Sequence, residues 1–205
     1  MTDSGIDLRY RTQLKRLETL MDVVFGLIIW RLFMLFPRPE GDNPGSVWDV
    51  LSGDSRAVLT VVIGIVIVII YWNQNNLLFG YLERTDARHT AFAIIQLFCL
   101  LLFLYAIAVG TNYDSAADTR VFESVTAMLV GVPAYFGWRH AKRAGLVSPE
   151  LSSEEADEIS VSILAEPISA AITIPFAIFT PLLWEAAWFS YPVVARILGR
   201  RKEKL

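Results

Sequence analysis

The sequence contains few of the residues that enzymes and metal sites depend on. It has one cysteine, Cys99, and two histidines among 205 residues, so an internal disulfide is excluded and a metal site is not expected. A glycine-rich phosphate loop, GxSxG and HExxH are all absent, and we therefore expect neither an enzyme nor a cofactor. The net charge of −3 and the lack of a basic patch with interleaved aromatic residues argue against nucleic acid as a partner.

Apolar residues are abundant and occur in long runs. They make up 54% of the chain, and their arrangement in blocks is typical of integral membrane proteins. A helix needs about 20 such residues to cross a bilayer. We therefore expect an all-α integral membrane protein with a single membrane domain, residues 1–205. Its six transmembrane helices are predicted over residues 19–37, 57–72, 90–110, 121–138, 159–178 and 181–198.

The last apolar block decides the number of crossings. Residues 159–198 are too long for one span, and Pro181 after Thr180 predicts a turn that divides them. A re-entrant half would give five spans instead. Lysine and arginine are concentrated at both termini and after the second and fourth spans, whereas the other two connections are mostly acidic. Because positive residues favour the cytoplasmic side, this alternation favours six spans with both termini in the cytoplasm.

Charged side chains interrupt several of the apolar segments, and Arg31 is the most unusual of them. Such residues are costly in lipid and usually face a bundle interior or an aqueous cavity. Arg31 and Glu185 are predicted at a similar depth, roughly 9 Å from the same membrane surface, whereas Glu166 lies on the other side. We hypothesise that Arg31 pairs with Glu185, within or between subunits. The alternative is an arginine that extends outward to lipid phosphates.

Two segments resemble a known family of membrane proteins. Arg16 and Asp22 have the spacing of the RxxxFSD pattern that begins the first helix in the family of the lysosomal potassium channel, transmembrane protein 175, and its prokaryotic relatives. Leu-Met here replaces the Phe-Ser of that pattern. Residues 71–108 resemble the passage from the second to the third helix, with Asn75 and Asn76 in place of a histidine pair. The prolines of the C-terminal block also resemble the last two helices of that family.

The resemblance implies a potassium channel assembled as a homotetramer, with the first helix of each subunit at the centre. It places the pore constriction, formed by large apolar side chains, at Leu27, Arg31 and Met34. Arg16 and Asp22 would tie the cytosolic mouth to the second and third helices. Steps of four and three residues put the constriction residues on one helical face. The implied partners are potassium or another small ion and the lipid bilayer. The resemblance also implies a multi-pass protein of a prokaryotic inner membrane.

Arg31 conflicts with potassium conduction. Four arginines at a constriction would repel cations, whereas rings of Leu27 and Met34 alone could gate by dewetting. Either Arg31 turns from the axis toward Glu185, or the protein is a non-conducting oligomeric scaffold or sensor related to that channel family. A coupled transporter is a third hypothesis, but the sequence lacks the paired repeats and glycine-broken helices of such folds. The resemblance makes Asn75 and Asn76 supporting polar residues. Glu185 is a third one, because of its depth relative to Arg31.

Overall fold

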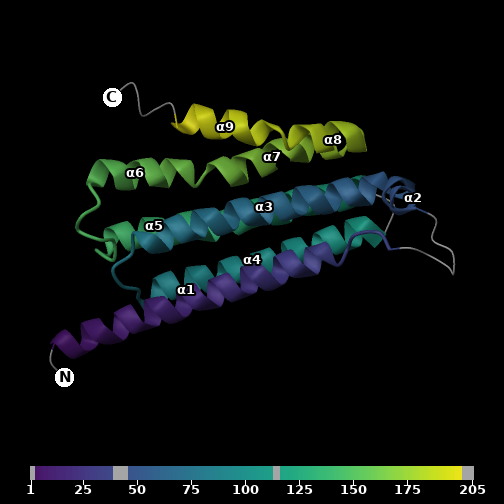
Figure 1. The fold of residues 1–205 in the computed structure, drawn as a ribbon. Coiled ribbons are helices and arrows are strands. Elements are labelled where there is room, and N and C mark those ends of the chain that lie inside the picture. Colours follow the sequence, from purple (N-terminus) through teal and green to yellow (C-terminus); the bar gives the residue numbers. More distant parts are fainter. Residues whose placement is uncertain (1–2, 39–45, 113–115, 200–205) are drawn as a thin grey trace.

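The computed structural model is an all-α bundle whose helices run roughly along one axis (Figure 1). The structure describes residues 3–38, 46–112 and 116–199. Its helices are α1 (Asp3–Phe33), α2 (Val47–Gly53), α3 (Ser55–Gly80), α4 (Ala87–Asn112), α5 (Ala117–Arg143), α6 (Ser153–Ser162), α7 (Ala165–Ala177), α8 (Pro181–Ala187) and α9 (Ser190–Gly199).

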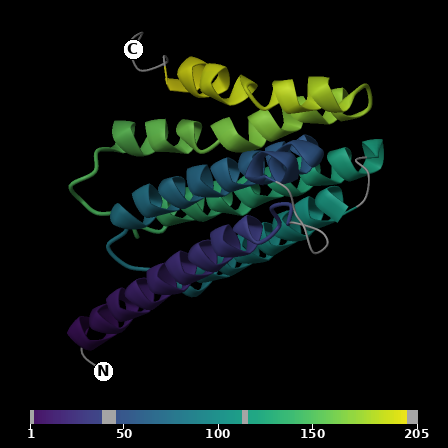
Figure 2. The ribbon, with the colours of Figure 1, turned by 45° about the vertical axis from the view of Figure 1, so that its right-hand side comes forward.

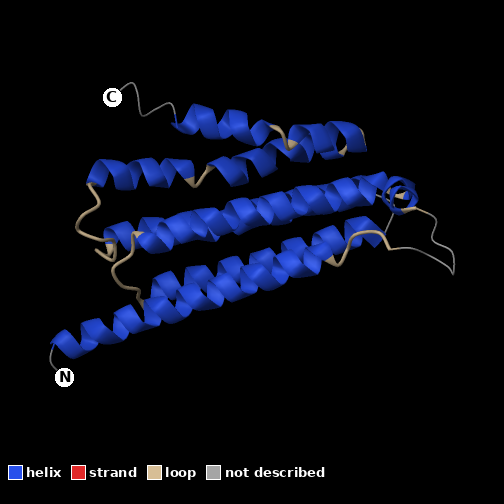
Figure 3. Ribbon diagram, viewed as in Figure 1, coloured by secondary structure: helices blue, strands red, loops and turns tan. Residues whose placement is uncertain are grey.

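The helices form successive layers that are visible from two directions. In Figures 1 and 2, α8 and α9 lie on one side, α6 and α7 beside them, and α1 on the opposite side of the molecule. The tightest packing joins α5 to α4 and to α7, while α1 packs on α3 and α4. α1 begins and α9 ends at the same end of the bundle (Figure 1). Turns and loops are confined to the two ends and to short breaks between successive helices (Figure 3).

Four helical stretches are long and apolar enough to cross a membrane. They are Ser55–Gly80, Ala87–Thr111, Ala117–Arg143 and Ser153–Ala177, the last formed by α6 and α7 together. α1 is not among them, and charged side chains such as Arg16, Asp22 and Arg31 interrupt its apolar part. α8 and α9 have 7 and 10 residues, fewer than a crossing requires. Six crossings therefore remain a prediction, since length and composition support four.

α1 begins earlier and ends earlier than the predicted first span. It starts at Asp3 rather than at residue 19, and it ends at Phe33, so residues 34–37 follow the helix. The early start has a physical cause in a buried stripe that recurs every three or four residues. Its members are Leu14, Leu17, Met21, Phe25, Ile28 and Leu32. Packing of Leu14 and Leu17 keeps the charged first half of α1 helical. The low hydropathy of that half excludes it from a membrane span.

Acidic residues just before the fifth predicted span form the first turns of α6. Ser152 caps α6, because its Oγ accepts a hydrogen bond from the Glu155 N–H at 3.2 Å. The Glu155 carboxylate in turn accepts from the Ser152 N–H at 3.0 Å, which completes a capping box. The helix then breaks before α7, because Pro167 has no N–H to donate to the carbonyl of Ile163.

The connections at the two ends of the bundle are fixed by backbone and capping hydrogen bonds. At the end where α1 begins, the Glu83 N–H donates to the Leu146 carbonyl at 2.9 Å and the Ser148 N–H donates to the Tyr81 carbonyl at 2.8 Å. These bonds join the α3–α4 connection to the α5–α6 connection. At the opposite end the chain reverses between α7 and α8, where the Thr180 side chain caps α8.

Gly131 allows α5 and α7 to approach closely. A Cβ at this position would lie 2.8 Å from Cδ and 2.9 Å from Cγ of Pro167. Gly131→Ala is therefore expected to lower the free energy of unfolding by about 1–3 kcal/mol, measured by chemical unfolding in detergent. Gly26→Ala is the matched control, because a Cβ there meets no atom within 4 Å and alanine favours a helix. Equal effects of the two substitutions would contradict this account.

Candidate functional site

One side of α1 carries large apolar side chains that the rest of the described chain does not cover. We call it the uncovered face, and its apolar members are Leu20, Val23, Leu27, Trp30 and Phe33. Their exposed fractions rise from 43% at Leu20 to 63% at Phe33. They recur every three or four residues and lie opposite the buried stripe of the same helix. An apolar surface of this extent needs lipid or another protein surface to cover it.

Leu27 and Arg31, two of the three predicted constriction residues, belong to α1 and are exposed. The third, Met34, lies in the turn just after Phe33, although its N–H still donates to the Trp30 carbonyl at 3.1 Å. This bond has the spacing of an α-helix, from residue 34 to residue 30. That the three residues share one helical face stays a prediction.

Asp22 links α1 to α3 through a side-chain hydrogen bond. The indole Nε1 of Trp72 donates to Asp22 Oδ1 at 2.9 Å. Asn75, about one turn further along α3, is buried, and its Nδ2 has no hydrogen-bond partner among the described residues. Asn76 and Arg16 are exposed. Of the residues predicted around the mouth, Asp22 contacts α3 and Asn75 is buried in the bundle. The other two face outward.

Glu185 does not meet Arg31 within one chain. α8, which carries Glu185, packs on α7 and α5, and it lies on the side of the molecule opposite α1 (Figures 1 and 2). The positive charges that act on Glu185 belong to Arg56 and Arg120. The predicted pair of Arg31 and Glu185 within a subunit is therefore wrong, because equal depth did not bring the two helices side by side. A pair between subunits stays a prediction.

A buried charge cluster near that end of the bundle centres on Arg120. Arg120 and Glu123, one turn apart in α5, expose 5% and 4% of their surface. The Arg120 Nε donates to the Ala177 carbonyl at 2.9 Å, and the charge of Arg120 acts on both Glu123 and Glu185. Arg120 was not among the charged residues singled out from the sequence. The spacing of three residues between Arg120 and Glu123 was the available signal.

Glu166 serves as a junction between three helices. The Gln74 Nε2 donates to Glu166 Oε2 at 2.6 Å, and the Tyr191 hydroxyl donates to Glu166 Oε1 at 3.4 Å. The carboxylate therefore holds α3 and α9 against α7.

At the other end of the bundle, Asp86 links the beginning of α4 to α5. Its Oδ1 accepts a hydrogen bond from the His89 N–H at 2.7 Å, and its Oδ2 lies 2.8 Å from Nε2 of His140. Burial alone would raise the pKa of Asp86, but these two hydrogen bonds and the nearby imidazoles hold that pKa below its ordinary value. Asp86 is therefore a carboxylate at neutral pH and can accept from both helices.

Comparisons with known proteins agree with one another. Residues 16–103, which include most of α1, all of α3 and much of α4, match the family described as the endosomal/lysosomal potassium channel TMEM175. The crystal structure of a lysosomal potassium-selective channel TMEM175 homolog from Chamaesiphon minutus is similar, with a TM-score of 0.74 and 16% identity. The match covers 93% of this chain and 98% of that one.

A second solved structure, a variant of the potassium channel MtTMEM175 bound to a nanobody–MBP fusion protein, has a TM-score of 0.63 and 19% identity. Here 93% of this chain and 94% of the other are covered. No match was found among curated protein sequences. At these identities the two structural matches establish a shared fold.

Proposed function

We propose that this chain, which matches the TMEM175 family over residues 16–103 and shares the fold of two TMEM175 channel structures over nearly its whole length, belongs to that family and is a subunit of an ion channel. The matched family is one of potassium channels rather than enzymes. The observation that carries the proposal is the uncovered face of α1. In the proposed assembly, a homotetramer, α1 is central and four copies of this face line a pore for potassium or another small ion.

Charge on the uncovered face favours a water-filled lumen over lipid. Arg16, Leu20, Val23, Leu27 and Arg31 follow one another at steps of four, three, four and four residues, so they lie along one side of the helix. Lipid would cover the apolar members but would make the two arginines costly. A narrow aqueous pore accommodates both kinds of side chain, because apolar rings can gate it by dewetting while charged groups stay hydrated.

The proposed topology has six crossings with both termini in the cytoplasm of a prokaryotic cell. Two observations support it: α1 begins and α9 ends at the same end of the bundle (Figure 1), and basic residues lie at that end. Those in the helices and connections there include Arg11, Arg84, Arg88, Arg139, Lys142 and Arg143. Positive residues near the ends of spans favour the cytoplasmic side.

At the proposed mouth, Asp22 positions α1 through its hydrogen bond to Trp72 in α3. Asn75 is buried about one turn after Trp72 in α3 and supports the contact between α1 and α3. This arrangement fits the role that the family resemblance gives to the Arg16 and Asp22 pair. Constriction is assigned to Leu27, with Met34 at the end of the helix completing the apolar lining.

One observation favours a second function. Arg31 is exposed near Leu27 on α1, where four copies would surround the axis and oppose cations. A non-conducting oligomeric scaffold or sensor, derived from the same fold, is the candidate that this observation favours.

Cysteine accessibility during conduction tests the proposed pore lining. In a Cys99→Ser background, Leu27→Cys is compared with Ile28→Cys, the adjacent position that is only 2% exposed. A charged thiol reagent is expected to remove most of the current of the Leu27→Cys channel and to leave the Ile28→Cys channel unchanged. Block at Ile28 alone, or at neither position in a conducting channel, would rule out lining by the uncovered face.

The same recordings identify the ion. Reversal potentials under potassium, sodium and chloride gradients are expected to follow the potassium gradient. A purified protein that stays silent under all three gradients would contradict the channel and support the scaffold.

A further inference from the structure

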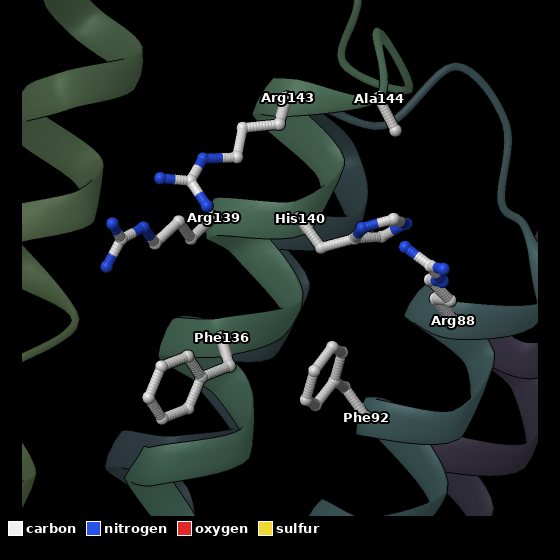
Figure 4. Close-up of a pocket in the computed structure, with 7 residues that line it drawn as sticks. All are labelled: Arg88, Phe92, Phe136, Arg139, His140, Arg143 and Ala144. Carbon is white, nitrogen blue, oxygen red and sulfur yellow. The ribbon is translucent and has the colours of Figure 1, made fainter.

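A pocket lies between the beginning of α4 and the end of α5. Its volume is about 640 Å³. The side chains that give it chemical character are Arg88, Arg139, His140 and Arg143 at one level and Phe92 and Phe136 at the next (Figure 4). None of the described residues that line it is an aspartate or a glutamate. The pocket therefore combines a cationic part with an aromatic part.

Both helices contribute side chains to the cationic part. In Figure 4, Arg139 and Arg143 extend to one side of the pocket, and Arg88 lies with His140 on the other. The hydrogen bond between His140 and Asp86 fixes the two helix ends relative to each other. In the part of the chain that the structure describes, no hydrogen bond or ion pair engages the guanidinium groups of the three arginines.

Three guanidinium groups without a neutralising partner repel one another and attract an anion. Arginine binds phosphate through paired N–H groups, with a planar geometry that lysine cannot reproduce. Two of the three arginines are in the last turns of α5, where the helix dipole adds negative potential that stabilises them. The site is thus suited to a phosphate group that approaches from outside the bundle.

The aromatic part continues into an apolar surface. The rings of Phe92 and Phe136 are stacked with centroids 6.3 Å apart. Beyond them, exposed apolar side chains continue along both helices to Tyr105 and Phe122, whose rings meet edge to face at 6.4 Å. The exposed side chains between the two aromatic pairs include Ile95, Phe98, Leu102 and Leu129. From Arg88 to Tyr105 the rise is about 25 Å, close to the thickness of the hydrocarbon core.

We propose that this pocket binds an anionic phospholipid. Its headgroup phosphate is held by Arg88, Arg139 and Arg143, and its acyl chains cover Phe92, Phe136 and the apolar surface of α4 and α5. A soluble phosphate compound would satisfy the arginines and leave the aromatic surface uncovered, whereas a phospholipid satisfies both. Basic pockets between transmembrane helices are a known mode of recognition for acidic headgroups.

The proposal is tested by native mass spectrometry of the purified protein in a neutral detergent. The experiment compares the binding of phosphatidylglycerol with that of phosphatidylcholine. Phosphatidylglycerol is expected to bind at least about tenfold more tightly, because only it carries net negative charge. The site variant is Arg88→Gln, Arg139→Gln and Arg143→Gln combined. All three side chains are exposed, so the fold should persist. We expect the Kd for phosphatidylglycerol to rise on the order of 100-fold.

The matched control removes the same charge elsewhere on the surface. It combines Arg9→Gln, Lys15→Gln and Arg196→Gln, which are exposed and outside the pocket, and it is expected to change the Kd less than about threefold. Equal losses in the two triple variants would overturn the site, as would equal binding of the two lipids. The melting temperatures of both variants, matched to that of the wild type, confirm folding.

A final comparison separates a lipid from a free phosphate compound. Glycerol phosphate in large excess is expected to leave bound phosphatidylglycerol in place. Phe92→Ala with Phe136→Ala is expected to weaken phosphatidylglycerol binding by about tenfold. Displacement by glycerol phosphate, together with no effect of the phenylalanine substitutions, would show an anion site only and overturn the assignment to a lipid.

Discussion

In the proposed tetrameric channel, Arg31→Leu is expected to raise the potassium conductance by about tenfold or more. Four arginines placed about 6 Å from an axis raise the energy of a cation there by about 3 kcal/mol, even at the dielectric constant of water. Screening by salt reduces this value, and each 1.4 kcal/mol corresponds to a factor of ten. The measurement is single-channel recording in lipid bilayers under a potassium gradient.

Arg31→Lys is the matched control, because it keeps the charge and changes the shape. It is expected to conduct like the wild type. If the leucine and lysine variants conduct equally, Arg31 lies away from the axis. A wild-type chloride current that disappears in Arg31→Leu would place Arg31 on the axis and contradict a potassium channel.

Arg120→Met is expected to lower the free energy of unfolding by about 3–5 kcal/mol, the largest effect on stability among these substitutions. Methionine fills a similar volume but leaves the buried carboxylate of Glu123 without its nearest positive charge. It also removes the hydrogen bond from Arg120 to the Ala177 carbonyl. Chemical unfolding in detergent measures the change.

The double variant Arg120→Met and Glu123→Gln tests the reason for that effect. Because it removes both charges, it is expected to be more stable than Arg120→Met alone, with a coupling energy in the range of 0.5–3 kcal/mol. Arg196→Met at an exposed position controls for loss of an arginine and should change stability by less than about 0.5 kcal/mol. Strictly additive costs would show that Arg120 and Glu123 act independently.

Apolar runs identified the central parts of α3, α4 and α5, but not their ends. The second span was predicted over 57–72, whereas α3 runs from Ser55 to Gly80. Hydropathy falls at the polar residues after Trp72, yet buried Asn75 and Leu78 keep that segment packed as a helix. A local pattern was available for this extension, because Leu77, Leu78 and Tyr81 recur at helical spacing beyond the span.

The sequence predicted the spacing of the apolar residues in the candidate site, but not which side of α1 packs on the other helices. α1 has two apolar stripes, one with Phe25 and Ile28 and the other with Leu27 and Trp30. Both have helical periodicity, so the sequence cannot tell which one packs on α3 and α4. The proposed pair of Arg31 with Glu185 failed within a subunit for a related reason, since helical rise gives depth but no lateral position.

The unbroken length of α1 has a mechanical consequence. Its 31 residues give a rod of about 46 Å, longer than a hydrocarbon core of about 30 Å, so roughly three turns extend into water if the other end reaches the far surface. Arg11 in this extension forms an ion pair with Glu83 in the α3–α4 connection. α1 contains no proline that would act as a hinge. We therefore expect it to move as a rigid rod, so that a tilt imposed through Glu83 would displace Leu27.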